Sequence, residues 1–204
     1  KIALLEANKD LINKISDAFT KSDDAIRNKS DQLFSNSESG NPIFNFSVSY
    51  QLKIDVENKR FQVGSMLVEW GKYINTDDGR EDTFTAKNNL EKIKEFLNKL
   101  SLAVNVLLPT SNVSQATIDG YKSDISIARN NINTAITNLT TSDGKLISAK
   151  SAVTLAEQEL VLKKSGKTTE QISAQKARVE SAEAKVANYS AQISKGILRA
   201  PIRG

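Results

Sequence analysis

The residues best suited to direct chemistry in this chain are the carboxylates of one acidic loop. Asp77, Asp78, Glu81 and Asp82 fall within six consecutive positions, and hard cations such as calcium bind carboxylate oxygens of this kind. Their order lacks the alternating ligand positions of an EF-hand loop. We therefore favour a solvated turn here, with a weak cation site as the alternative and a catalytic role as the least favoured.

The sequence contains no histidine and no cysteine. Histidine is the commonest metal ligand and general base in proteins, and cysteine supplies thiolate ligands, nucleophiles and disulfides. Because both residue types are missing, we expect no metal centre, no cofactor and no enzymatic activity.

Half of the aromatic side chains fall in one stretch of about thirty residues in the first half of the chain. They either line a pocket for an apolar ligand or fill the core of a small helical bundle. We favour the second interpretation, because a small bundle needs large side chains to fill its interior. The residues are Phe44, Phe46, Tyr50, Phe61, Trp70 and Tyr73.

The composition indicates an elongated helical bundle with a solvated, charged surface. The 204 residues carry a net charge of +4, and aromatic residues make up only 6% of them. Lysines alternate with acidic residues and form no basic run with interleaved aromatics, so we expect no nucleic-acid partner. No stretch approaches the roughly 20 apolar residues of a membrane span. We interpret the chain as a fragment whose membrane anchor lies outside it.

A seven-residue apolar repeat dominates the second half of the chain. A repeat this long stays on one face only if the helix packs against a partner helix, because a straight isolated helix lets the stripe drift. The pattern predicts one long helix over about 114–165. Its repeat positions are Ile118, Ile125, Ile132, Leu139, Leu146, Val153 and Leu160.

A second helix is predicted directly after this one. Thr168 and Gln171 have the spacing of a capping box, in which each side chain bonds the backbone amide of the other residue. The helix at 168–196 repeats Ile172, Val179 and Val186 at the same interval. Since the turn at 164–168 is short, we expect the two helices to form an antiparallel coiled-coil hairpin.

The first 34 residues show the same period and predict a third amphipathic helix. Two apolar series run side by side there and together form its apolar face. The first series is Leu5, Ile12, Phe19, Ile26 and Leu33, with Leu4, Leu11, Ala18 and Ala25 as its companions.

Residues 35–113 interrupt the repeat and are interpreted as an inserted helical region. A helix is predicted over about 50–73, preceded by extended chain to about Val48, and another over 85–108, which Pro109 ends. The expected buried face of the helix over 85–108 consists of Leu90, Ile93, Leu97, Leu100, Val104 and Leu107.

If residues 1 and 196 both adjoin one domain, the five predicted helices require a further traverse of the molecule. One candidate is a reversal at Asp143-Gly144, since an Asp-Gly pair favours turns. The other is residues 35–49 running extended, which at about 3.3 Å per residue span roughly 45 Å. We favour the second candidate, because the repeat passes from Leu139 to Leu146 without a change of phase.

The last eight residues read I-L-R-A-P-I-R-G. Residues 197–204 resemble the I-x-A-P-[FIV]-D-G start of the second lipoyl-like half-motif in membrane fusion proteins, the periplasmic adaptors of the haemolysin D type. In that family a helical hairpin is inserted between the two halves of a lipoyl-like β-domain. The matching residues are Ala200, Pro201 and Gly204, whereas Arg203 stands where the family usually has Asp. The resemblance covers residues 1–34 and 114–204, and the region 35–113 is not part of the usual hairpin.

Family members that dock onto an outer-membrane exit duct resemble one another in an Arg-Leu-Ser signature near the hairpin tip. The tip here reads V-L-K-K-S-G-K over 161–167 and lacks that triplet, so docking to such a duct is not expected. The residues expected to bind a partner at the tip are Lys163, Lys164, Ser165 and Lys167.

The resemblance implies an all-α hairpin with an inserted bundle, ending at the start of a lipoyl-like half-motif. It also implies a non-catalytic adaptor of a transenvelope efflux or secretion system. Such an adaptor forms homo-oligomers in the cell envelope outside the cytoplasm and couples to an inner-membrane transporter of the ABC or resistance-nodulation-division type. The alternatives are an extracytoplasmic helical module that senses a small ligand, and a structural coiled-coil spacer.

Overall fold

The computed structural model describes residues 1–74 and 83–196. The chain divides into two compact units, Lys1–Val153 and Thr154–Gly204. The described residues are mostly helical, which agrees with the predicted all-α class. The elements are α1 (Ile2–Asp23), a π-helical segment η1 (Asp24–Ser30), a 3₁₀ turn η2 (Asp31–Leu33), strands β1 (Phe34–Ser35) and β2 (Ile43–Phe44), α2 (Tyr50–Ile74), α3 (Thr83–Asn105), α4 (Gln115–Lys164) and α5 (Thr169–Gly196).

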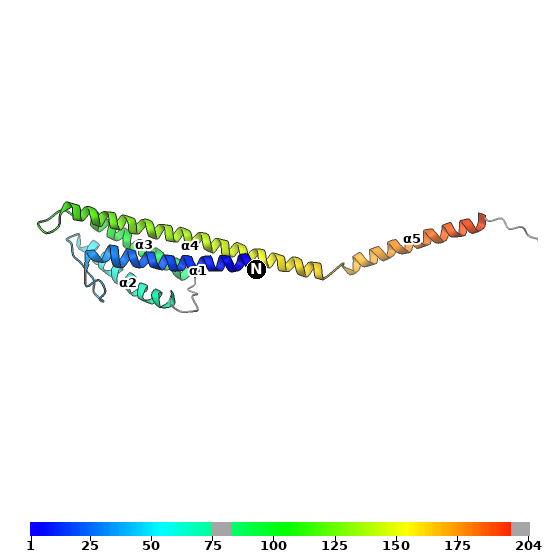
Figure 1. The fold of residues 1–204 in the computed structure, drawn as a ribbon, viewed down its shortest axis with the longest axis horizontal. Helices are drawn as coiled ribbons and strands as arrows, with labels where there is room; N and C mark the ends of the chain where they lie inside the picture. Colours follow the sequence, from blue (N-terminus) through cyan, green and yellow to red (C-terminus); the bar gives the residue numbers. More distant parts are fainter. Residues whose placement is uncertain (75–82, 197–204) are drawn as a thin grey trace, which may run out of the picture. The chain divides into compact units, whose positions relative to one another are not determined.

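Helices α1 to α4 of the first unit pack as an up-and-down bundle (Figure 1). The side-chain contacts between them give the directions, because in each helix pair the residue numbers rise on one helix as they fall on the other. Lys99 binds Asp55 and Glu95 binds Lys59 between α2 and α3. The same opposed order joins α3 to α4 through Lys87–Asp143 and Asn98–Arg129. It also joins the first helical stretch to α4 through Asp10–Ser142 and Lys29–Asp124, and to α2 through Phe19–Trp70 and Asp31–Arg60. Each helix therefore runs antiparallel to the next, and α4 returns beside α1.

The apolar repeat of α4 is buried in this bundle as far as Leu146. Ile118, Ile132 and Leu139 are fully buried, and Leu146 is 7% exposed. Burial of each such side chain contributes about 1.5–3 kcal/mol. The polar contacts of α4 with α1 and α3 identify those helices as the partners. The prediction that α5 is the partner along this stretch is therefore wrong for positions 118–146.

Helix α4 passes through Gly144 without a break, as predicted. The predicted face of α3 is also confirmed, since Leu90, Ile93, Leu97 and Leu100 are fully buried. In α2 the buried positions Val56, Val63, Leu67 and Trp70 lie on one helical face. These regular stripes place the core at the centre of the four helices.

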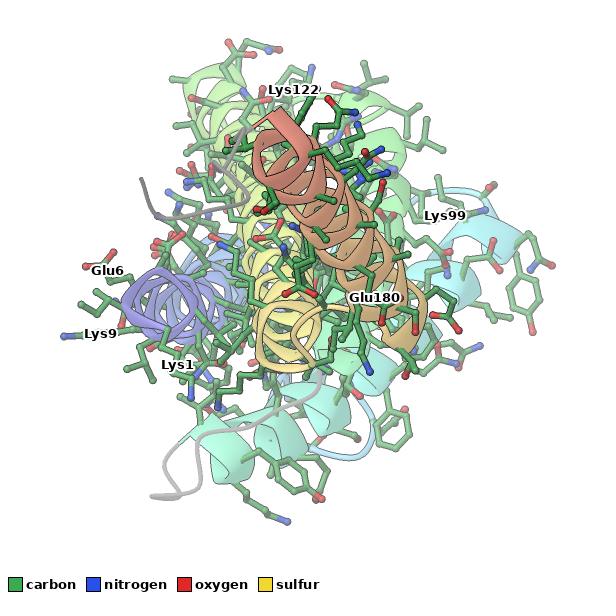
Figure 2. The ribbon with its side chains drawn as sticks, turned by 90° about the vertical axis from the view of Figure 1, so that its right-hand side faces the viewer. Lys1, Glu6, Lys9, Lys99, Lys122 and Glu180 are labelled. Carbon is green, nitrogen blue, oxygen red and sulfur yellow. The ribbon has the colours of Figure 1, made fainter. Side chains whose placement is uncertain are left out.

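The two apolar series of α1 are buried to different extents over its first three turns. Leu5 is 71% exposed and Ile12 38% exposed, whereas their companions Leu11 and Ala18 are buried. Glu6 and Lys9 point outward from the same helix in Figure 2. The first series becomes buried only at Ile26, in the π-helical segment. One period with two adjacent apolar series does not fix which series faces the core.

Residues 34–44 fold back instead of crossing the molecule. Phe34 pairs with Phe44 and Ser35 with Ile43 in an antiparallel two-stranded ladder. Asn36 adopts a φ of 55° in the intervening loop, a left-handed conformation that asparagine tolerates. The extended traverse predicted for 35–49 is therefore wrong, and the alternating bundle needs none. The partner strand of β2 is β1, which directly follows the first helical stretch.

The second unit contains the end of α4 and all described residues of α5. Every residue from Thr154 to Gly196 is exposed, and α5 buries none of its side chains. No described helix is both long enough and apolar enough to cross a membrane.

Candidate functional site

The turn between α4 and α5 has well-defined local geometry. Gly166 has a φ of 68°, a conformation that glycine adopts without steric cost. The backbone N–H of Thr168 donates to Gln171 Oε1, and the N–H of Gln171 donates to Thr168 Oγ1, both at 3.3 Å. The predicted capping box is therefore confirmed. Figure 1 shows α5 beginning directly after this turn.

Glu170 completes the N-terminal turn of α5. Its own backbone N–H and the Thr168 hydroxyl donate to its carboxylate and lower the pKa of Glu170 from its ordinary value. A negative charge at this end of a helix also interacts favourably with the helix dipole.

The residues predicted to bind a partner at the tip are all exposed. Lys163 and Lys164 end α4, and Ser165 donates its hydroxyl to the carbonyl of Leu162 at 2.7 Å. Lys167 lies one residue before the capping box. The structure gathers these side chains at one turn but gives them no ion pair among the described residues, so the tip presents three lysine cations to solvent. The predicted lipoyl-like residues Ala200, Pro201 and Gly204 lie outside the described residues.

An uncovered apolar stripe runs along the whole of α5, and we call it the α5 stripe. Its members recur every seven residues and would be buried if a second helix packed against them. On α4, Leu160 is 50% exposed at the equivalent repeat position. The stripe consists of Ile172 (58% exposed), Val179 (48%), Val186 (64%) and Ile193 (66%).

A second candidate site is a groove of about 330 Å³ in the first unit, bordered by α2, η1 and the loop after β1. Arg60 lies at its base with a side chain only 4% exposed. Its Nε and Nη2 donate to Asp31 Oδ1 and Oδ2 at 2.6 and 2.9 Å. Phe61, half exposed, forms part of the apolar wall. We call this the Arg60 groove.

Sequence reasoning missed the Arg60 groove. The signal on α2 was local, since Gly64 follows Arg60 by one helical turn and leaves room for the guanidinium. A Cβ at position 64 would lie 2.5 Å from Arg60 Nη1. The partner Asp31 is 29 positions away, and only the fold brings the two residues together.

The predicted aromatic cluster does not form a single pocket. Phe44 and Trp70 are core residues, each 1% exposed, whereas Tyr50 and Tyr73 are largely exposed. Trp70 packs edge-on against Phe19 with ring centroids 5.6 Å apart. The favoured interpretation as core packing therefore holds for part of the set, and only Phe61 lines the groove.

The acidic loop of Asp77, Asp78, Glu81 and Asp82 lies outside the described residues. Within residues 1–74 and 83–196, no group of three or more acidic side chains lies close enough together to hold a metal ion. Comparison with protein-family models, with curated proteins and with solved structures gives no match to this chain.

Proposed function

We propose that this chain is the helical part of an adaptor subunit of the membrane fusion type. The adaptor would belong to a transenvelope efflux or secretion system and lie outside the cytoplasm. The observation that carries the proposal is the α5 stripe, a 28-residue helix with a seven-residue apolar repeat and no buried side chain. A helix patterned in this way is stable when another helix covers its stripe. The sequence motif with Ala200, Pro201 and Gly204 directly after it supports the family.

The helix that covers the α5 stripe is proposed to be the end of α4, which would form an antiparallel hairpin with α5. Residue numbers on the two arms of such a hairpin sum to a constant, and the repeat positions satisfy this condition. Leu160 would face Ile172, and Val153 would face Val179. The outer faces of these hairpins would then pack against other copies, and an inner-membrane transporter of the ABC or resistance-nodulation-division type would supply the energy.

Disulfide crosslinking tests the hairpin directly, because the chain has no native cysteine. The Leu160→Cys and Ile172→Cys pair is expected to crosslink within one chain in the full-length protein. The control pair, Gln158→Cys with Ala177→Cys, carries its thiols on the outer faces of both arms and is not expected to react. Equal crosslinking of the two pairs would contradict the hairpin.

The adaptor role itself is tested on the full-length protein in its own cell envelope. Affinity purification after crosslinking is expected to recover further copies of the protein together with an inner-membrane transporter, identified by mass spectrometry. Recovery of a signalling receptor in place of a transporter would favour the ligand-sensing module. Recovery of copies alone would favour the structural spacer, and either result would overturn the adaptor role.

A further inference from the structure

The Arg60 groove contains a buried cation with unused hydrogen-bond donors. A guanidinium carries five N–H groups, and the bonds to Asp31 use two of them. The remaining edge is formed by Nη1 and the second hydrogen of Nη2. Nη1 has no hydrogen bond to any described residue and lies over Gly64, which itself lines the groove. The free edge of Arg60 is thus directed at the groove.

The surroundings of this edge combine paired charges with apolar surface. Both cations that line the groove have carboxylate partners: Arg60 binds Asp31, and Arg27 binds Asp23 and Glu38. Glu38 is 78% exposed and binds Arg27 Nη1 at 3.3 Å. Phe61 and Val68 line the same groove and are 46% and 51% exposed. Large apolar side chains beside a few convergent donors are typical of small-molecule sites.

We propose that the Arg60 groove binds a small carboxylate with an apolar body. The two oxygens of a carboxylate match the spacing of two parallel N–H groups on a guanidinium edge. The body of the ligand would pack against Phe61 and Val68, and the volume of about 330 Å³ limits it to a compact molecule. This ligand site is independent of the proposed adaptor function.

The guanidinium of Arg60 has more N–H donors than the ion pair that joins α2 to η2 requires. A buried ion pair is often no more stabilising than apolar residues of similar size. A tie between α2 and η2 also needs only the Nε and Nη2 edge that Asp31 occupies. Gly64 gives the guanidinium its room, and the tie leaves unused the Nη1 edge that a ligand site would employ.

Titration of the 204-residue chain with benzoate tests the proposal, followed by amide chemical shifts and by calorimetry. Benzoate has the proposed chemistry, and benzamide is a neutral probe of nearly the same shape. The expected result is a benzoate Kd of about 1 mM or tighter, with shifts at residues around Arg60 and at least tenfold weaker binding of benzamide. No benzoate binding, or equal binding of both probes, would overturn the proposal.

Gly64→Ala is the most informative variant. The new Cβ occupies the space beside Nη1, and since only the flexible end of Arg60 must move, the fold is expected to persist. Benzoate binding should fall at least tenfold. The matched control is Gly144→Ala, because a Cβ at Gly144 meets nothing within 4 Å, and it should bind like the parent chain. Equal affinity of the two variants would contradict the site.

Phe61→Ser provides a second variant that does not touch the guanidinium. Since Phe61 is half exposed, the substitution should leave the folded state populated, which the thermal midpoint checks. Benzoate affinity should fall several-fold through loss of the apolar wall. Unchanged affinity would place the bound probe outside the Arg60 groove and overturn the assignment.

Discussion

The same seven-residue apolar repeat is buried in the first unit and exposed in the second. In the first unit Ile118, Ile125 and Ile132 on α4 are almost fully buried, whereas in the second unit Ile172 and Val179 on α5 are about half exposed. The residue types and the spacing are alike, so the repeat specifies a helix with an apolar stripe in both places. The difference is the presence of a partner. A covered stripe stabilises the chain by itself, and an uncovered one is a surface for association.

The largest expected effect of a substitution lies at the buried ion pair of the first unit. Asp31→Ala leaves Arg60 buried without its counter-ion, which should lower the free energy of unfolding by about 3–5 kcal/mol. Urea denaturation measures the change. The control is Glu183→Ala on α5, an exposed carboxylate whose loss should change stability by about 0.5 kcal/mol or less.

A loss below about 1 kcal/mol for Asp31→Ala would contradict the expectation that Arg60 stays buried when its counter-ion is removed. It would mean that the freed guanidinium reaches water through the Arg60 groove and recovers its hydration.

A direct test of the comparison truncates one repeat position in each unit. Ile132→Ala should lower the free energy of unfolding by about 2–5 kcal/mol, because it removes fully buried methyl groups and leaves a cavity. Ile172→Ala, at an equivalent position that is 58% exposed, should lower it by about 0.5 kcal/mol or less. Chemical denaturation of the isolated chain measures both. Similar losses at the two positions would show that the α5 stripe is buried in solution.

The smallest expected effect is a weakening of the α2–α3 contact in acid. The hydrogen bond from Lys99, with that from Gln51, lowers the pKa of Asp55, and the hydrogen bond from Lys59 lowers the pKa of Glu95. A carboxyl whose pKa is lower in the folded state stabilises the fold above its ordinary pKa. That stability is lost as the pH falls through the folded-state value. The urea midpoint should therefore decline slightly below about pH 4.

Asp55→Asn and added salt are the controls for this pH dependence. The variant lacks one of the titrating groups, and salt screens exposed pairs of this kind, so each should flatten the acid side of the profile. The lowered pKa of Glu170 has a local cause in α5, so its protonation should reduce helicity at the start of α5 without moving the midpoint of the bundle. A profile that Asp55→Asn leaves unchanged would assign the acid sensitivity to other carboxyls.

The sequence predicts most elements of this fold but few of their partners. Neighbouring residues are enough to predict the features that depend on periodicity and local chemistry. These features are the apolar stripes of α3 and α4, the capping box at Thr168 and the continuity of α4 through Gly144. The pairing of α4 with α1 and α3 does not follow, because any helix with a matching stripe satisfies the same pattern. The tip residues were predicted to bind a partner, and that role stays a prediction, although all of them are exposed. The Arg60 groove depends on a contact between residues 31 and 60, for which a single sequence gives no signal.

The π-helical segment Asp24–Ser30 changes the spacing of the inward-facing positions along the first helical stretch by one residue. Before it, Leu4, Leu11 and Ala18 lie one heptad apart on the inward face, and the next two steps lead to positions 25 and 32. Ala25 is buried as this spacing requires, but at the second step Leu33 is buried and position 32 is exposed. The offset of one residue arises because the wider turn accommodates one extra residue. The hydroxyl of Ser30 accordingly bonds the carbonyl of Ala25, five residues back. A chain shortened by one residue between 24 and 30 would keep the same inward face with an ordinary α-helix. This turn is therefore a place where the length of the protein can change while its core composition stays the same.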